Sequence, residues 1–260
     1  MGIPLNKKHA IESASFVIAY EKPFPETVVN SLSSLQEIVK DDLPLFQPIN
    51  IIEFRIDQDN ASIPSMGKAA GVFLQSVNAE GKQTWGLRVE ANTLILTAFE
   101  YDKWLPTSEH AFKLIKIVGN LLSDQENPVA VVGYQVIDKF ISPPATEYDI
   151  KDVFNTKSEF LSKHALGAGK LWHVYQGWFD EPVSNPGRML NVLNIATNDT
   201  VDGLVTTIDH NVQIQSQNRI SSREVINQDW LRSTYDELHN ANKDVISRAL
   251  NAKQKRDIKL

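Results

Sequence analysis

Histidines are the residues of this sequence best suited to chemistry, because they can ligate soft metals and exchange protons near neutral pH. The chain has six of them and no cysteine. None of the six forms an H-E-x-x-H pair, and none is clustered with another in sequence. The lack of cysteine excludes disulfides, thiolate nucleophiles, Cys-ligated zinc and iron–sulfur clusters. We therefore expect no cofactor and no metal, and histidines that are satisfied by hydrogen bonds.

Two histidines fall on segments that we expect to be strands. His173 and His210 have large apolar neighbours, and Asp209 points to the face opposite His210 because side chains alternate along a strand. This alternation prevents Asp209 and His210 from acting together as an acid–base pair. An enzyme would need His173, His210 or His239 to meet a carboxylate in space, and spacing along the sequence cannot predict such a meeting.

A polar stripe near the end of the chain contains another histidine. Asp236, His239, Asn240 and Lys243 are three or four residues apart and share one side of an expected helix. The stripe either faces solvent or lines a groove.

Aromatic residues on one expected strand form the remaining candidate. Trp172 and Trp178 share one face of this strand, and Tyr175 and Phe179 share the other. Both faces are large and partly apolar, so we expect the strand to be covered on both sides. The candidate ligand-binding residues are Trp172, Trp178, His210 and His239.

The sequence Gly167-Ala168-Gly169-Lys170 resembles the end of a phosphate-binding loop but lacks two of its features. His164 stands where the first glycine belongs, and Leu171 follows the lysine in place of Ser or Thr. No serine lies in a G-x-S-x-G elbow. Neither nucleotide binding nor serine hydrolase chemistry is predicted.

The first part of the chain reads as strand, helix, strands, helix. Alternation predicts a strand over 13–20, and helical spacing predicts a helix between Pro25 and Pro44. Strands are expected at 51–56, 71–77 and 84–99, with a turn near Asn92, and a second helix carries Phe112, Ile115, Val118 and Leu122.

The second part repeats this order. A strand is expected over 129–137, a weaker helix over 150–164, strands at 171–179, 189–195 and 204–214, and a closing helix over 229–250. Pro23 to Trp104 and Pro143 to Trp230 span nearly equal lengths of chain. We therefore predict an α+β fold of two similar halves, 1–127 and 128–260, each an antiparallel sheet with packed helices. Together they would form one pseudo-symmetric unit with a groove between them.

Composition limits the partners. With 42% hydrophobic and 22% charged residues among 260, the chain can bury an ordinary globular core. A net charge of −6 makes nucleic acid an unlikely partner because phosphates would be repelled. No segment approaches the ~20 apolar residues needed to cross a bilayer, and no signal peptide is evident. We expect a cytoplasmic protein without a membrane partner; the oligomeric state is left open.

The chain resembles a sporadically distributed bacterial family of conserved hypothetical proteins of about this length, for which no activity is established. The residues that carry this resemblance are Tyr20-Glu21-Lys22-Pro23, Val132-Gly133-Tyr134, Asp138, Phe140, Ile208-Asp209 and Leu238-His239-x-x-Asn242. The resemblance implies a bacterial setting and adds no catalytic residue.

The function that these observations favour is a non-enzymatic binding module. It would sense a small-molecule ligand or dock a partner protein in the groove between the halves, where aromatic strands can line an apolar cleft. The alternative is a hydrolase-type enzyme that uses a His/carboxylate site in the same groove.

Overall fold

The structure is a computed structural model. It describes residues 2–6, 9–51, 56–57, 60–61, 67–123, 126–143, 147–183, 187–201 and 203–260. All strand pairs within them are antiparallel, as the sequence predicts.

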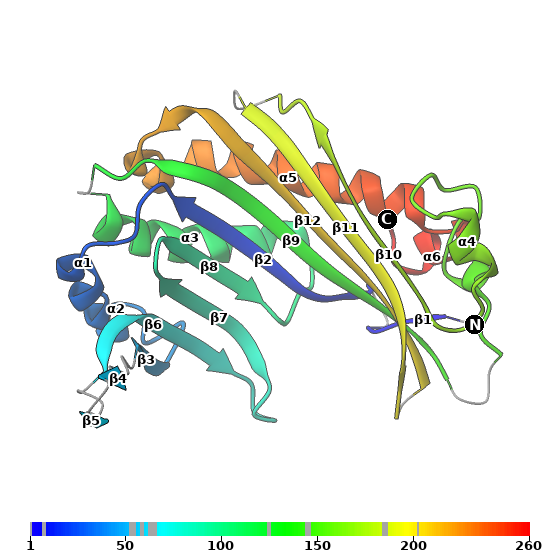
Figure 1. The fold of residues 1–260 in the computed structure, drawn as a ribbon, viewed down its shortest axis with the longest axis horizontal. Helices are drawn as coiled ribbons and strands as arrows, with labels where there is room; N and C mark the ends of the chain where they lie inside the picture. The colour runs from blue at the N-terminus through cyan, green and yellow to red at the C-terminus, as the bar shows by residue number, and fades with distance from the viewer. Residues whose placement is uncertain are drawn as a thin grey trace.

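One ten-stranded sheet dominates the molecule (Figure 1). Its order is β10-β11-β12-β9-β2-β8-β7-β6-β3, with β1 paired to β9. The strands are β1 (Ile3–Pro4), β2 (Ile11–Tyr20), β3 (Leu45–Ile51), β6 (Lys68–Val77), β7 (Gln83–Glu90), β8 (Thr93–Ala98), β9 (Val129–Ser142), β10 (Trp172–Asp180), β11 (Gly187–Thr200) and β12 (Gly203–Ile220). A separate pair comprises β4 (Ile56–Asp57) and β5 (Asn60–Ala61).

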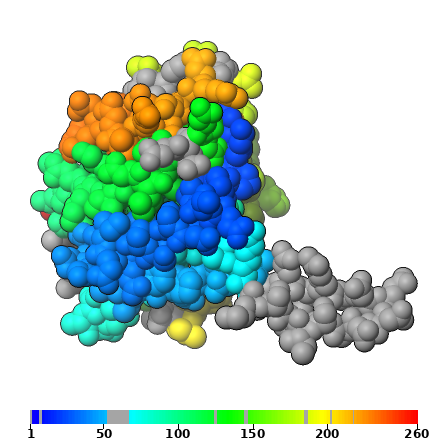
Figure 2. Space-filling model, turned by 90° about the vertical axis from the view of Figure 1, so that its left-hand side faces the viewer, coloured from blue at the N-terminus to red at the C-terminus, as the bar shows by residue number. Residues whose placement is uncertain are grey.

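Two long helices lie across one face of this sheet (Figure 1). They are α3 (Trp104–Leu122) and α5 (Gln228–Ala249). The shorter helical elements are α1 (Glu26–Ser31), η1 (Leu32–Ser34), α2 (Leu35–Ile38), η2 (Ile150–Asp152), α4 (Lys163–Gly167), η3 (Ser222–Ile226) and α6 (Ala252–Asp257). At one end of the molecule the blue α1 segment, the green α3 and the orange start of α5 pack in one layer (Figure 2).

The helix-covered face is built by the alternation that the sequence predicts. On β2, every second side chain from Ala14 to Tyr20 is buried, and on β12 the same holds from Thr206 to Ile214. On α5 the predicted apolar face is confirmed, with Leu231, Tyr235 and Leu238 fully buried against the sheet. Asn227 caps this helix by accepting hydrogen bonds from the N–H groups of the first turn.

Two predictions about β10 and the segment before it are wrong. The helix expected over 150–164 is replaced by η2 and then, after an irregular stretch, by α4. The strand β10 is an edge strand, and only its Trp172 face is covered. On its other face Tyr175 is 68% and Phe179 57% exposed, so the cover expected on both sides is not present among the described residues. The strand expected over 51–56 falls largely outside the described residues.

The two ranges 1–127 and 128–260 join edge to edge through β2 and β9 within one sheet, rather than facing each other as two sheets. Outward from this junction the order is β2, β8, β7, β6, β3 on one side and β9, β12, β11, β10 on the other.

The buried apolar side chains form two clusters on the helix-covered face. One cluster contains Phe16 and Tyr134, and the other contains Phe140 and Ile246. Between them the strands carry buried polar residues, among them Asp138 on β9, His210 on β12 and Asn191 on β11. This polar seam is where the candidate site lies.

Candidate functional site

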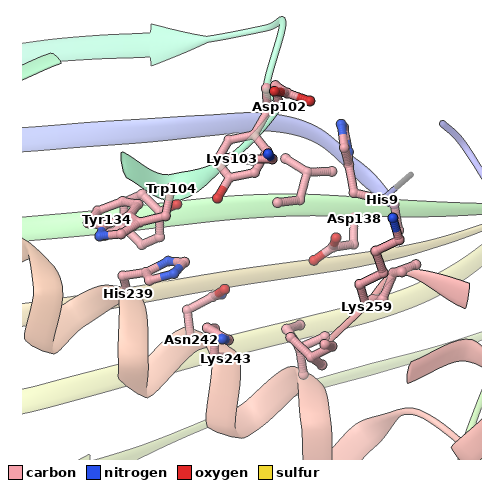
Figure 3. A pocket seen from close by; sticks show the side chains of 16 residues that line it. His9, Asp102, Lys103, Trp104, Tyr134, Asp138, His239, Asn242, Lys243 and Lys259 are labelled. Atoms are coloured by element: carbon pink, nitrogen blue, oxygen red, sulfur yellow. The ribbon is translucent and has the colours of Figure 1, made fainter. Parts of the chain in front are cut away.

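A cavity of about 330 Å³ opens where the polar seam meets α5 (Figure 3). Its walls come from β9, from α5, from residues 101–104 at the start of α3, from residues 9–11 and from the last three residues of the chain. Both ranges, 1–127 and 128–260, therefore contribute to it. Its volume lies at the lower end of the range of small-molecule sites.

The β9 wall presents Tyr134 and Asp138, which share a face because they are four residues apart on a strand. Asp138 is 3% exposed, and no hydrogen bond among the described residues involves its carboxyl group. Burial raises the pKa of Asp138 to about 7. This carboxyl group therefore changes charge near neutral pH.

The Tyr134 hydroxyl is fully buried and has no hydrogen-bond partner among the described residues. Burial raises the pKa of Tyr134 well above its ordinary value, and Tyr101 and Asp138 raise it further. Burial likewise raises the pKa of Tyr101, with Asp138 as the next contribution. The two phenols and the carboxyl group thus lie close enough to influence one another's charge.

The α5 wall presents His239, whose ring stacks on Trp104 with centroids 4.0 Å apart and planes 1° from parallel. Trp104 is itself held by a 2.7 Å hydrogen bond from its Nε1 to Asp236. Burial lowers the pKa of His239 to about 4, and the nearby Lys243 lowers it further while Asp236 opposes the shift. The ring is neutral at pH 7, and its Nδ1 is buried without a partner in the described part of the chain.

Asn242, one turn further along α5, lines the cavity with one end of its amide. Its Nδ2 lies 3.0 Å from Nδ1 of His210, on the side of Asn242 away from the cavity. In Figure 3 the oxygen of Asn242, the carboxyl group of Asp138 and the ring of His239 are turned toward the same space.

The cavity has a charged rim and an apolar lining. Lys103, Lys243 and Lys259 line it and are exposed, and none of the ion pairs found among the described residues includes them. Ile246 and Ile258 supply apolar surface beside them. A ligand here would have its inner end among Tyr134, Asp138 and His239, and its outer end near the three ammonium groups and the Asp102 carboxyl group.

Of the four candidate residues from the sequence, the structure places His239 in the cavity. His210 is fully buried directly behind it, linked through Asn242. Trp172 packs in the second apolar cluster and donates from Nε1 to the Tyr148 hydroxyl at 3.0 Å. Trp178 stacks on the Phe160 ring, 5.2 Å between centroids, and does not line the cavity.

The polar stripe on α5 is divided in its roles. His239 and Lys243 line the cavity, and Asp236 holds Trp104, whereas Asn240 is exposed. His173, the third histidine considered for an enzyme, is exposed on the opposite sheet face and lies 2.8 Å from Asn194. The three histidines therefore do not share a pocket.

Several site residues carry no functional signal in the sequence. Tyr134, Asp138 and Asn242 appear there only in short motifs, and Trp104 only as a helix boundary. A buried acid on an otherwise apolar strand face is the one local sign that could point to Asp138, since charged residues are almost never fully buried.

Comparison with models of known protein families and with curated proteins finds no match for this chain. Over the described residues, no group of three or more His, Asp and Glu side chains is arranged to hold a metal ion. None of the helices described is both long and apolar enough to span a membrane.

Proposed function

We propose that this protein is a non-enzymatic binding module that holds a small molecule in the cavity between β9 and α5. The observation that carries the proposal is that two residues lining this cavity each have a buried polar atom with no hydrogen-bond partner among the described residues, the Tyr134 hydroxyl and His239 Nδ1. Leaving a buried polar group unpaired costs about 1–3 kcal/mol, so most such groups are paired in folded proteins. A ligand that supplies the missing hydrogen-bond partners would explain why two such atoms belong to residues of one cavity. It would also explain the adjacent Asp138, whose carboxyl group makes no hydrogen bond among the described residues.

A small ligand fits this cavity better than a protein partner does. The polar groups lie at its inner end, with Tyr134 fully buried and Asp138 3% exposed, where a flat protein surface would not reach them. The aromatic side chains Trp104 and Tyr101 give the walls the mixed apolar and polar character typical of small-molecule sites.

A hydrolase-type enzyme is the second candidate, and one observation favours it. Asp138, with a pKa of about 7, could take or give a proton at neutral pH. Against it, the described residues that line the cavity include no Ser or Thr nucleophile, and no hydrogen bond joins Asp138 to His239. Incubating the parent and Asp138→Asn proteins with nitrophenyl esters and phosphates tests it. Hydrolysis that disappears in Asp138→Asn would replace the binding proposal.

We also propose that the ranges 1–127 and 128–260 are two similar halves related by a pseudo-twofold axis between β2 and β9. Support comes from the first four strands on each side of the junction, β2-β8-β7-β6 and β9-β12-β11-β10, and from the long helix, α3 or α5, that follows the strands of each half. The acidic, cysteine-free composition supports a cytoplasmic location and argues against nucleic acid as a partner.

Ligand-observed NMR with a library of small polar aromatic and aliphatic compounds tests the binding proposal. Ile258→Trp fills the cavity from its half-buried rim, and Val77→Trp introduces a tryptophan at an exposed position of β6, away from the cavity. We expect compounds that bind the parent and Val77→Trp proteins and not Ile258→Trp. If compounds bind all three equally, or none binds the parent, the cavity is not the site.

A further inference from the structure

A series of hydrogen bonds that runs from the exposed Asp180 to the buried Asn242 determines which atom of Asn242 faces the cavity. This series of bonds begins at Asp180, whose Oδ2 accepts hydrogen bonds from Trp178 Nε1 at 3.0 Å and from Asn191 Nδ2 at 2.8 Å. A carboxylate can only accept, and an indole N–H can only donate. The amide nitrogen of Asn191 must therefore point to Asp180, and its oxygen must point the other way.

The Asn191 oxygen lies 3.2 Å from Nε2 of His210. Because an amide oxygen can only accept, Nε2 of His210 carries the hydrogen. Burial lowers the pKa of His210 to about 4, so the ring is neutral and its other nitrogen, Nδ1, has a lone pair. That nitrogen accepts from Asn242 Nδ2 at 3.0 Å.

The consequence is that the amide oxygen of Asn242 is the atom left for the cavity. At Asn242, the α5 wall of the cavity therefore accepts hydrogen bonds from a ligand. Asp138, on the facing wall, is also an acceptor when ionised. The fixed cationic donors, Lys103, Lys243 and Lys259, are exposed at the rim and not at the inner end.

We propose that the ligand of this cavity is a small organic ammonium ion with a single positive charge. Its N–H groups would bind the Asp138 carboxylate and the Asn242 oxygen, and its apolar body would lie against Ile246 and Ile258. The rim carries three lysines and one carboxyl group, Asp102, so its net positive charge disfavours a second ammonium group at the outer end. This inference rests on the proposed function and names the ligand class.

The direction of the hydrogen bonds from Asp180 to Asn242 can be tested without any ligand. Long-range ¹H–¹⁵N NMR of the full chain should show His210 with a protonated Nε2 and a lone pair on Nδ1, unchanged from pH 7 to pH 5.5. A protonated Nδ1 would turn the Asn242 oxygen toward His210 and its NH₂ group toward the cavity. That result overturns the ammonium inference and leaves the proposed binding function in place.

Four probes built on six-carbon chains test the ligand class directly at pH 8: hexylammonium, 1-hexanol, hexanoate and 1,6-hexanediammonium. The signal of Trp104 Nε1–H reports occupancy, because Trp104 lines the cavity. We expect hexylammonium to bind about tenfold more tightly than hexanol, since hydrogen bonds to charged groups contribute about 1.5–3 kcal/mol. The diammonium probe and hexanoate should bind less tightly than hexylammonium.

Asp138→Asn keeps the side chain's size and removes its charge, and Asp41→Asn makes the same change at an exposed position that does not line the cavity. Asp138→Asn should bring hexylammonium and hexanol to within about twofold of each other, and Asp41→Asn should leave the preference unchanged. If hexanoate or hexanol binds the parent as well as hexylammonium does, the ammonium inference is overturned and the cavity remains a site. If none of the probes shifts Trp104 and the compound library also fails, both proposals are overturned.

Discussion

His210 and His239 lie on the two sides of Asn242 and share a lowered pKa of about 4, yet their surroundings differ. Burial is the main cause of both shifts. His210 is fully buried, and both of its ring nitrogens have partners, Asn191 and Asn242. His239 has a buried Nδ1 with no partner among the described residues, and its ring closes one side of a cavity.

Burial alone therefore does not mark a functional histidine. A lowered pKa follows from desolvation in either setting. What separates the two is whether the folded chain itself satisfies the ring. His210 is bonded to Asn242 through Nδ1, whereas Nδ1 of His239 has no partner in the described part of the chain.

The largest expected effect is at the paired histidine. His210→Ala removes a fully buried ring and leaves the Asn191 oxygen and the Asn242 amide nitrogen without their partner. We expect a loss of about 4 kcal/mol in the free energy of unfolding, from the cavity and from two unpaired groups. Urea denaturation measures it, and His173→Ala, on the exposed sheet face, is the control with little expected change. A small loss for His210→Ala would show that the buried chain of hydrogen bonds does not stabilise the fold.

Leu238→Ala tests whether α5 itself is integral to the fold. Leu238 is fully buried in the first apolar cluster, next in sequence to His239. Truncating a buried leucine costs about 2 to 5 kcal/mol, and we expect about 3 here. A parent-like melting temperature would show that this helix contributes little to stability, and the cavity wall that it forms would then be an unreliable basis for a site.

Most of the strands and helices that carry these two histidines and the cavity could be predicted from the sequence. Periodicities of two and of about 3.6 identify β2, β12, α3 and α5 with their buried faces, because apolar burial repeats with the geometry of each element. Antiparallel pairing follows from strands that arrive in succession between single helices. The prediction of a helix over 150–164 was wrong because the apolar residues of this segment pack into the second cluster from irregular structure. Irregular structure has no repeat that a sequence pattern could reveal.

The site itself could be predicted only in part. The stripe on α5 contains His239, but the cavity forms because β9 brings Asp138 opposite that stripe, a contact about a hundred residues apart in sequence. Trp172 and Trp178 were candidates because they are large aromatics on one strand face. They lie instead against Phe154 and Phe160, since a large aromatic face is packed by whichever apolar segment reaches it.

Asp138 should make the stability of the protein depend on pH. The titratable and charged side chains that line the same cavity are His9, Tyr101, Asp102, Lys103, Tyr134, His239, Lys243 and Lys259. The folded pKa of about 7 lies above the ordinary value of 3.8. Between these values the folded chain holds a proton that the unfolded chain has lost, so this group's contribution to stability falls as pH rises from about 4 to 7 and is level above.

Asp138→Asn should remove this fall. Relative to the parent, the variant should gain on the order of 2 kcal/mol between pH 4.5 and pH 8, because each pKa unit corresponds to about 1.4 kcal/mol and the cavity retains part of the carboxylate's hydration. His210 and His239 make a contribution of opposite sign between pH 4 and 6.5, but they are present in both proteins and cancel in the difference. Urea denaturation at several pH values measures it. Parallel stability curves for the two proteins would show that Asp138 is not held in a desolvated state.

The smallest expected effect on stability is at the unpaired histidine. His239→Ala loses the stack on Trp104, a contact of the kind that contributes about 0.5–1.5 kcal/mol, but it also removes a buried nitrogen that has no partner. The two changes oppose each other, so we expect a net loss of about 1 kcal/mol or less, against about 4 for His210→Ala. Ligand binding should respond more strongly than stability does, because the His239 ring forms part of the cavity wall and His239→Ala should weaken the binding of any compound that the cavity holds. Thermal unfolding and the NMR titration on the same variant measure the two responses. A loss of stability at His239 as large as that at His210, without an effect on binding, would mean that both rings serve the fold and that the unpaired nitrogen does not mark a site.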